Sequence, residues 1–349
     1  MPIVAAGELT QVCMDVFRGL GISEADAAVV TRSMVDANLV GHDSHGVIHL
    51  PKYVRELKAG LINPDAEIEV VRESASIAVL NGNWGFGPVI ATHAVNLAIE
   101  KAKTCDVSTV TAYRCNEVGR LGGYAQIASD ANMIGLLTVN DHGGGQCVAP
   151  FGGIEGRLST NPIACAIPVG GRAPILVDMS TSVVASGKLR LKQHRSEPLP
   201  KGWITDAHGN ASTNVEDFYA SPPGALLPFG GIAAHKGFAL SVLVDILSGA
   251  LSGAGCSREG GARVGNGLFV TAINIGSFTD LPKFQAEVGR FIDYLKVTKR
   301  RPDVEELLMP GERGSREAAK RKAQGVFIED ETWAEIQRLK REYEQHQYS

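Results

Sequence analysis

The stretch His42-Asp43-Ser44-His45-Gly46 places two imidazoles, a carboxylate and a hydroxyl directly after an apolar helical repeat. The repeat stops at Gly41, and glycine commonly ends helices, so the polar cluster is expected at a helix exit. Histidine titrates near neutral pH, and a neighbouring hydroxyl or carboxylate can fix its tautomer. His45 is therefore the first candidate acid/base, oriented by Ser44 and Asp43. Asp43 and Ser44 could instead cap the following segment and leave the histidines solvated.

Residues on either side of this stretch predict interleaved helices and strands. Apolar residues recur at helical spacing through residues 8–60, and Ser23-Glu24-Ala25-Asp26 has the acidic first turn of a helix start. Apolar runs predict strands at 67–71, 76–80, 107–112 and 133–139, and helical periodicity predicts helices at 89–104, 236–253 and from 283 onward. This mixture indicates the α/β fold class.

The composition excludes several classes of protein. Of 349 residues, 44% are hydrophobic and 21% charged, and the formal net charge of −4 offers no basic surface for nucleic acid. We find neither a secretory signal nor a run of about 18 apolar residues, so we expect no membrane span and a cytoplasmic location. The six scattered cysteines lack metal-like spacing, so we predict reduced thiols and no metal site.

Glycine clusters occur, but none has the spacing of an ordinary dinucleotide-binding fingerprint. No G-x-G-x-x-G stands at a strand-to-helix turn, so a standard Rossmann fold is not expected. Residues 119–123 and 143–145 are glycine-rich and could let the backbone approach a ligand, although simple turns explain them equally well. His142 precedes the second cluster and is a further candidate for proton transfer.

Five separated motifs carry a resemblance that covers almost the whole chain. They are Asp43-Ser44-His45-Gly46, the segment 148–162, Val177–Ser182 followed by Gly187-Lys188, Gly231–Gly237, and Leu308–Glu312. In this order they resemble the malate/L-lactate dehydrogenase family of NAD(P)-dependent 2-hydroxyacid oxidoreductases. Ala37-Asn38-Leu39, Gly119-Arg120-Leu121-Gly122 and His235-Lys236-Gly237 are similar to the bacterial hydroxycarboxylate dehydrogenase B branch.

The resemblance implies a fold, a set of domains and a cofactor site. It implies a mixed, largely antiparallel sheet with surrounding helices, divided into a helical domain (1–70 plus 283–349) and a cofactor- and substrate-binding domain (71–282), with a small inserted subdomain around 122–176. It also implies a homodimer that binds NAD or NADP. The residues implied as cofactor contacts are Asp178, Met179, Ser180, Thr181, Ser182, Val183, His235, Lys236, Gly311, Glu312 and Arg313. Backbone amides and hydroxyls of Ser180–Ser182 and the charge of Lys236 suit phosphate.

Two departures from the family affect the catalytic site. Many members have an arginine at the position of His49, where it would hold a substrate carboxylate, so Arg120 is the expected replacement. Many also have a histidine where this chain has Glu117, so the proton-transfer role passes to His45, to His142 or to Glu117 itself. A carboxylic acid can serve only if burial raises its pKa. Glu117 could otherwise pair with Arg120 or face a cationic substrate group.

These observations predict a dehydrogenase that moves a hydride between nicotinamide and C2 of a small-molecule carboxylate substrate, a 2-hydroxy or 2-oxo acid. In this prediction His45 exchanges the proton and Arg120 holds the carboxylate. One alternative is a reductase of cyclic imines or N-substituted amino acids, with Glu117 binding the cation. Another is a cofactor-binding protein with impaired catalysis. The basic run of Lys188, Arg190, Lys192, His194 and Arg195 could receive the 2′-phosphate of NADP or form an exposed basic strand.

Overall fold

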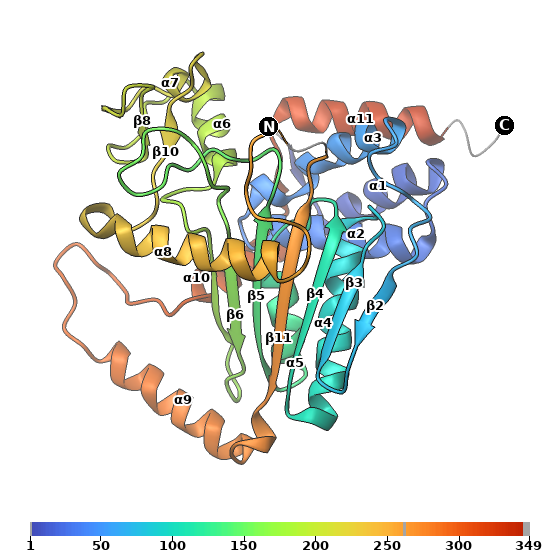
Figure 1. Ribbon diagram of the computed structural model, residues 1–349, viewed down its shortest axis with the longest axis vertical. Coiled ribbons are helices and arrows are strands. Elements are labelled where there is room, and N and C mark those ends of the chain that lie inside the picture. Colours follow the sequence, from blue (N-terminus) through green and yellow to red (C-terminus); the bar gives the residue numbers. More distant parts are fainter. Residues whose placement is uncertain (1, 261–262, 345–349) are drawn as a thin grey trace.

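A seven-stranded mixed sheet forms the centre of the computed structural model, which describes residues 2–260 and 263–344 (Figure 1). The strand order is β2-β3-β4-β11-β5-β6-β7, and every neighbouring pair is antiparallel except β3 and β4. The strands are β2 (Glu69–Glu73), β3 (Ile77–Asn81), β4 (Val107–Cys115), β5 (Met133–Asp141), β6 (Ile163–Ile167), β7 (Ile175–Met179) and β11 (Asn266–Asn274). The expected mixed, largely antiparallel sheet is confirmed.

Helices cover both faces of this sheet. On one face, α4 (Gly87–Cys105) packs on β4 and β11, and α5 (Leu121–Asp130) packs on β5 and β6. The alanines of α4 are buried, and their small side chains bring the helix close to the strands. On the other face, α8 (Ala234–Asp245) and its π-helical continuation Ile246–Ala250 cross β5 and β11 (Figure 1).

Polar bonds fasten α8 and its continuation to the sheet. Asn140 on β5 donates to Asp245 at 2.6 Å, and the hydroxyls of Thr138 and Ser248 lie 2.7 Å apart. The helical segment Gly231–Ala250 is long and apolar enough to cross a membrane, contrary to the sequence-based expectation, and 33% of its apolar window is buried in the fold. These buried polar contacts show that the segment is a sheet-covering helix here.

A second core joins the two ends of the chain. It is formed by α1 (Ala6–Gly19), α2 (Glu24–Leu39), α3 (Leu50–Lys58) and α11 (Asp330–Glu344), whose apolar faces meet around Phe17 and Tyr53. Ser23 caps α2 by accepting the Asp26 N–H, as the acidic helix start predicts. The short strands β1 (Ile3–Val4) and β12 (Val326–Phe327) pair antiparallel beside these helices.

Two smaller clusters lie outside these cores. One contains α6 (Ser186–His194), α7 (Glu216–Tyr219) and a small sheet of β8 (Ile204–Thr205), β9 (Ala211–Ser212) and β10 (Ala225–Leu226), around buried residues between Val148 and Leu226. The other packs α9 (Leu281–Lys296) near Val169 and Met309, before α10 (Glu312–Gln324) begins. The expected inserted segment 122–176 instead contributes α5, β5, β6 and β7 to the central layers.

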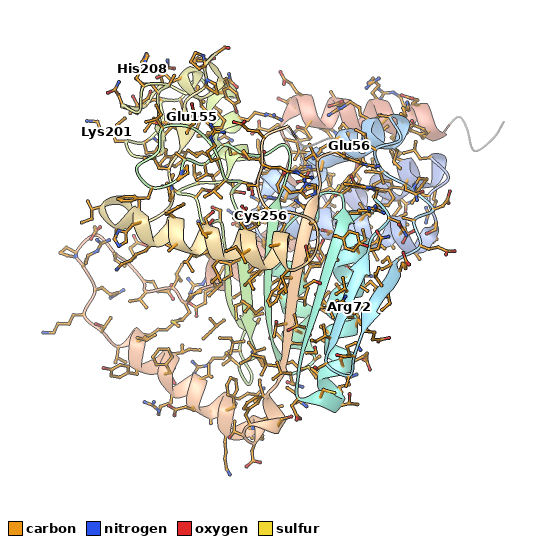
Figure 2. The ribbon with its side chains drawn as sticks, viewed as in Figure 1. Glu56, Arg72, Glu155, Lys201, His208 and Cys256 are labelled. Atoms are coloured by element: carbon orange, nitrogen blue, oxygen red, sulfur yellow. The ribbon has the colours of Figure 1, made fainter. Side chains whose placement is uncertain are left out.

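Charged side chains protect the outer strand of the main sheet. Every residue of β2 is exposed, and Arg72 projects from this edge, as Figure 2 shows. Charges on an edge strand discourage pairing with another chain.

Candidate functional site

The predicted polar cluster forms two short 3₁₀ turns between α2 and α3. These are Asp43–His45 and Val47–His49, and Gly41 precedes them with φ +81°, the left-handed conformation expected after a helix end. Within the first turn, the Ser44 hydroxyl lies 3.1 Å from Nδ1 of His45. Burial is the largest influence on the His45 imidazole and lowers its pKa below the usual value, so the neutral ring is favoured at neutral pH.

His49 connects this turn to Glu117. Its Nε2 lies 2.7 Å from the Ser44 carbonyl oxygen, which can only accept, so Nε2 carries a hydrogen. Its Nδ1 faces Oε2 of Glu117 at 3.5 Å, and its ring stacks on His45 with centroids 6.1 Å apart. Both nitrogens therefore face oxygen atoms that can accept a hydrogen bond.

Glu117 is an ionised carboxylate bound to Lys52. Lys52 reaches from α3 and donates to Oε2 of Glu117, which lies in the loop after β4. Burial favours the neutral acid, but the positive charges of His49 and Lys52 outweigh it and lower the pKa of Glu117 to about 2. The sequence-based alternatives of Glu117 as a general acid and of a Glu117–Arg120 pair are therefore corrected.

Arg120 pairs with Asp178 instead. Arg120 precedes α5, Asp178 lies near the end of β7, and Nη1 of the arginine is 3.0 Å from Oδ2 of the aspartate. Both side chains are largely buried. A Cβ at Gly122 would collide with Asp178, so the glycine there makes room for the pair. The charges of Arg120 and Asp178 both act on His45, which places this pair in the same site.

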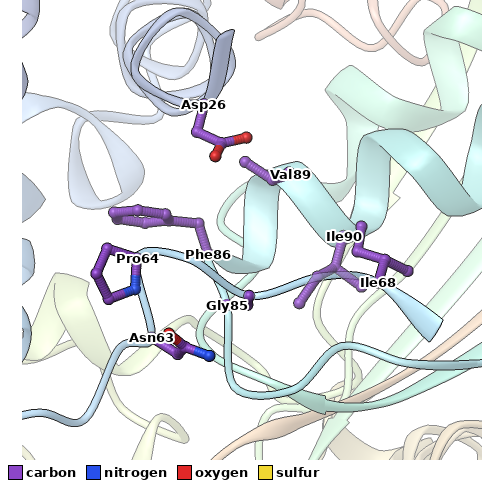
Figure 3. A pocket seen from close by; sticks show the side chains of 9 residues that line it. Asp26, Asn63, Pro64, Ile68, Gly85, Phe86, Val89 and Ile90 are labelled. Carbon is purple, nitrogen blue, oxygen red and sulfur yellow. The ribbon is translucent and has the colours of Figure 1, made fainter. Parts of the chain in front are cut away.

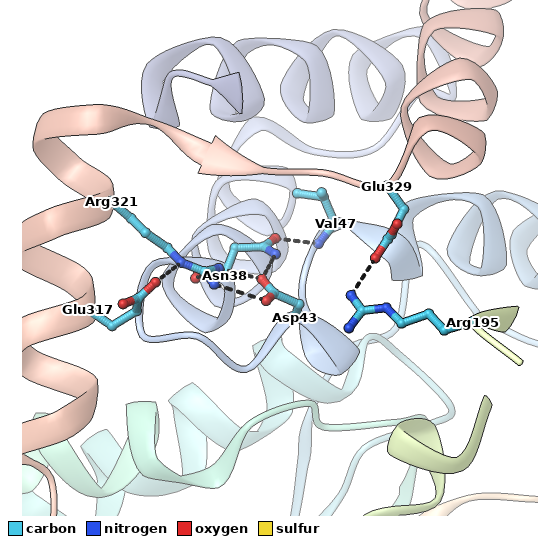
Figure 4. A network of polar contacts seen from close by, with 7 residues as sticks. All are labelled: Asn38, Asp43, Val47, Arg195, Glu317, Arg321 and Glu329. Atoms are coloured by element: carbon cyan, nitrogen blue, oxygen red, sulfur yellow. Dashed lines mark hydrogen bonds and ion pairs between the residues drawn. The ribbon is translucent and has the colours of Figure 1, made fainter. Parts of the chain in front are cut away.

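Asp43 forms its side-chain bonds with Arg321 and Asn38 and not with the His45 ring. Its carboxylate accepts two bonds from Arg321 of α10 and one from Asn38 of α2 (Figure 4). Asp43 therefore fastens the turn to the rest of the protein.

His142 has a different environment from His45. The side chain is buried, and its Nδ1 has no hydrogen-bond partner among the described residues. Burial again lowers the pKa of the imidazole. Beside it, Asp141 accepts bonds from the backbone N–H groups of Gly143 and Gly144, so that glycine cluster is a turn. No polar group in the described structure orients the His142 ring for proton transfer.

The segment after β7 was expected to bind phosphate through its hydroxyls. Thr181 and Ser182 are buried, and their hydroxyls donate to backbone carbonyls, as does that of Ser180. The Val183 N–H donates to the Leu227 carbonyl. These hydroxyls therefore hold the segment in shape, and Met179 at its start is exposed.

The remaining expected cofactor contacts lie at two helix starts. His235 and Lys236 are exposed in the first turn of α8, with the Phe151 ring 5.8 Å from the His235 ring. Gly311 begins α10 beside β7, where the Leu176 N–H donates to the Pro310 carbonyl. Glu312 accepts from the Met309 N–H and from Lys296, so its carboxylate is already engaged, whereas Arg313 is exposed.

The basic run after β7 lies on helix α6, not on a strand. Gly187 at its start packs against Ser44, so the first turn of α6 adjoins the Asp43–His45 turn. Lys192 pairs with Glu197 and Arg195 with Glu329, which leaves the exposed Lys188 and Arg190 at the accessible side. The side chain of His194 lies outside the described residues.

The crevice in Figure 3 is too small to compete with this site. The crevice in Figure 3, lined by Asp26, Asn63 and Phe86, has a volume of about 10 Å³, room for at most one water. Within residues 2–260 and 263–344, no three His, Cys, Asp or Glu side chains are grouped to hold a metal ion.

Sequence reasoning missed Lys52, Asn38 and Arg321 as members of the site. Lys52 follows His49 by three residues, a spacing that can align two side chains where a helix begins. That spacing was the available signal for Lys52. Arg321 gave no local signal, because its partner Asp43 lies 278 residues away.

Comparisons with known proteins agree with this geometry. The family model described as malate/L-lactate dehydrogenase matches residues 4–337. The malate dehydrogenase of Pyrococcus abyssi is 39% identical over 88% of this chain and 85% of its own length. Hydroxycarboxylate dehydrogenase B of Escherichia coli is 33% identical over 92% of this chain and 89% of its own length. The solved malate dehydrogenase of Pyrococcus horikoshii superposes with a TM-score of 0.89 at 35% identity, covering 98% of this chain and 95% of that one.

Proposed function

This chain belongs to the malate/L-lactate dehydrogenase family and is a 2-hydroxyacid dehydrogenase, and we propose that His45 exchanges the proton of its substrate hydroxyl. The substrate is a small 2-hydroxy or 2-oxo carboxylic acid, and the hydride moves between its C2 and the nicotinamide of NAD or NADP. The observation that carries this proposal is the single cluster of Ser44, His45, His49, Glu117 and Lys52 between the helical core and the sheet.

The neutral His45 ring is suited to accept a proton during oxidation of the hydroxyl. Burial favours this neutral form, and Nδ1–H can donate to the Ser44 hydroxyl, which orients the ring and leaves Nε2 as the nitrogen that accepts the substrate proton. In the reverse direction, the imidazolium returns the proton to the developing alkoxide. The nearby negative charge of Glu117 supports this imidazolium.

Lys52 and Arg120 supply positive charge for the substrate carboxylate in this proposal. Lys52 uses one N–H for Glu117 and lies 3.7 Å from Oε1 of Glu56, and its side chain is 38% exposed, so a further N–H is accessible. Arg120 uses Nη1 for Asp178 and is more deeply buried. Lys52 is thus the more accessible group and takes over from the arginine that many relatives have at the position of His49.

The residues present fit a dinucleotide by their chemistry. A helix start with an exposed Lys236 and His235 suits a phosphate group, and the exposed Met179 suits an apolar ring face beside Asp178. We assign Ser180, Thr181, Ser182 and Val183 to shaping this segment through their internal bonds. When bound, the nicotinamide would supply or take up the hydride. Gly311, Glu312 and Arg313 would contact the dinucleotide from the start of α10, where the Pro310 carbonyl accepts the Leu176 N–H of β7.

Assembly and location are part of the proposal. Four large apolar side chains on and around α9 are exposed, namely Phe278, Phe291, Tyr294 and Val297, and a homodimer would cover such a surface. The two domains are 1–70 plus 283–349 and 71–282, with the site between them. The six free cysteines suit the reducing cytoplasm. Light scattering coupled to size exclusion tests the dimer.

The imine-reductase alternative has less support. A solved Δ1-piperideine-2-carboxylate reductase of Pseudomonas syringae superposes with a TM-score of 0.84 at 26% identity, and Glu117 is ionised. However, Lys52 and His49 already balance the Glu117 charge, so no cationic substrate is needed. The higher identity to an archaeal malate dehydrogenase than to hydroxycarboxylate dehydrogenase B likewise favours a malate-like acid over an assignment to that branch.

Nicotinamide absorbance during turnover tests the proposal directly. Oxo acids of one and two carboxylates are supplied with NADH or NADPH, each with and without an amine. Turnover without amine supports the dehydrogenase. Turnover only with amine supports the imine reductase, and binding of cofactor without any turnover supports the catalytically impaired alternative.

A further inference from the structure

Arg321 of α10 holds the turn that carries His45, through a network centred on Asp43. Its Nη1 and Nη2 lie 2.6 and 3.1 Å from the two carboxylate oxygens of Asp43, a two-point contact (Figure 4). Nη1 also donates to the Asn38 carbonyl at 2.7 Å, and Nε donates to Glu317 at 2.6 Å. Each nitrogen of the guanidinium therefore has an acceptor.

Asn38 completes the network from the last turn of α2. Its side-chain amide donates to Asp43 at 2.7 Å, and its oxygen accepts the Val47 N–H at 2.8 Å. Asn38 is 2% exposed, and a Cβ at Gly46 would collide with its side chain. Both ends of the His45 turn are thus fixed, one at Asp43 and the other at Val47.

The Asp43–Arg321 contact differs from an ordinary surface ion pair. The Arg321 side chain is only 15% exposed and bonds to backbone as well as carboxylate, so its rotamer is fixed. Arg316 on the same helix also makes a two-point contact, with Glu306. The two carboxylates, Asp43 and Glu306, are about equally exposed, but the Arg316 side chain is 57% exposed. That pair offers a matched comparison, because it contacts no part of the His45 turn.

We infer that Arg321 is a positioning residue for the reaction, acting through Asp43 and Asn38 to hold His45 in its reactive orientation. This inference rests on the proposed role of His45. Proton transfer depends strongly on position, and a displacement of about 1 Å can lower a rate about 100-fold. Arg321 itself need not contact substrate or cofactor for this effect.

Loss of Arg321 also changes the charge near His45. The charges already acting on this imidazole are those of Glu117, His49, Asp178 and Arg120. Without Arg321, the carboxylate of Asp43 loses its guanidinium partner two residues from His45. An uncompensated negative charge favours the imidazolium, so the pKa of His45 rises. A residue that served stability alone would not produce this shift.

The experiment compares Arg321→Ala, Asp43→Asn and the control Arg316→Ala. Arg321→Ala is expected to lower kcat about 10- to 100-fold with little change in cofactor Kd, and Asp43→Asn to lower it less. Added guanidinium at low millimolar concentration is expected to restore part of the kcat of Arg321→Ala. Arg316→Ala is expected to keep the kcat of the unsubstituted protein.

Histidine NMR titration provides a readout that needs no turnover. The His45 resonance, assigned with His45→Ala, is expected to titrate at higher pH in Arg321→Ala than in the unsubstituted protein or in Arg316→Ala. If His45→Ala retains turnover, the proposed acid/base role fails, but the NMR shift still tests the contact. Unchanged kcat and unchanged His45 titration in both Arg321→Ala and Asp43→Asn would overturn the inference, as would equal losses of kcat in Arg321→Ala and Arg316→Ala.

Discussion

Nδ1 of His49 lies 3.5 Å from Oε2 of Glu117, while Nε2 of the same ring lies 2.7 Å from the Ser44 carbonyl oxygen. This histidine thus connects the acid/base turn to a carboxylate that lies beyond β4 in the sequence. Its ring also stacks on His45. A change at Glu117 is therefore transmitted to His45 by charge and through the position of His49.

Glu117→Gln tests this relationship through the pH dependence of oxidation. The Glu117 charge raises the pKa of His45, so its removal lowers that pKa. Oxidation needs neutral His45, and the acidic limb of kcat/KM is therefore expected to move to lower pH. A pH profile measured with saturating cofactor checks the shift. An identical acidic limb would show that Glu117 does not act on the acid/base.

Glu117→His restores the residue found in many relatives and tests the substrate class. If the site favours plain oxo acids already, the ratio of oxo-acid to imine turnover is expected to stay high in both proteins. The cation-binding alternative predicts that this ratio rises in the variant, because an ionised carboxylate that favours an iminium is lost. Both substrates are compared in one absorbance assay.

Lys52→Gln is expected to raise the KM for carboxylate substrates about 10-fold, because an accessible ammonium that can bind the carboxylate is lost. Cofactor Kd is expected to change little. Lys58→Gln provides the matched control, since Lys58 lies on the same helix and pairs with Glu342 far from the site. An equal KM in the two variants would show that a group other than Lys52 binds the substrate carboxylate.

His45→Ala is expected to lower turnover about 100-fold or more while cofactor affinity stays near that of the unsubstituted protein. Steady-state kinetics and a cofactor titration measure the two effects separately. His142→Ala is the comparison, because its buried ring has no orienting partner in the described structure. A larger loss of turnover in His142→Ala than in His45→Ala would show that His142, and not His45, exchanges the substrate proton.

The sequence predicted the elements whose signal is local. The strand expected at 107–112 is observed as β4, Val107–Cys115, and the polar turn was correctly placed after a helix that ends near Gly41. Apolar periodicity and glycine position are sufficient for such features. The helix at the basic run 188–195 was harder to predict, because charged residues surround Leu189, which is buried in a small core.

The partners of charged side chains could not be predicted in the same way. A pair of Arg120 with Glu117, three residues earlier, was one sequence-based alternative, yet Arg120 pairs with Asp178 across 58 residues. Glu117 binds Lys52 across 65 residues. These pairs depend on which strand ends and helix starts meet in space, and that arrangement leaves no periodic pattern in the sequence. The carbonyl that accepts from the Thr181 hydroxyl, that of Asn161, lies 20 residues away and likewise leaves no local pattern.

Arg120→Gln tests whether the Arg120–Asp178 pair is mainly structural. The substitution leaves a largely buried carboxylate without its cation, which typically costs about 3 kcal/mol or more of unfolding free energy. We therefore expect a marked loss of stability in chemical denaturation at neutral pH. Asp178→Asn provides the reciprocal variant. A raised KM with unchanged stability would instead identify Arg120 as the carboxylate-binding group first expected from the sequence.

His42 links stability to pH in the acidic range. Burial lowers the pKa of this imidazole most strongly, to about 4, from an ordinary value of 6.5. Between these values the unfolded chain binds a proton that the folded protein does not, so stability falls as pH falls from about 6.5 to about 4. One such proton changes the unfolding free energy by about 1.4 kcal/mol per pH unit. His42→Asn is expected to flatten this slope by up to that amount, measured by urea unfolding across the window. His93→Asn, at an exposed position on α4, is the comparison variant. An equal slope of unfolding free energy against pH in the two variants would show that burial of His42 does not cause the loss of stability at acidic pH.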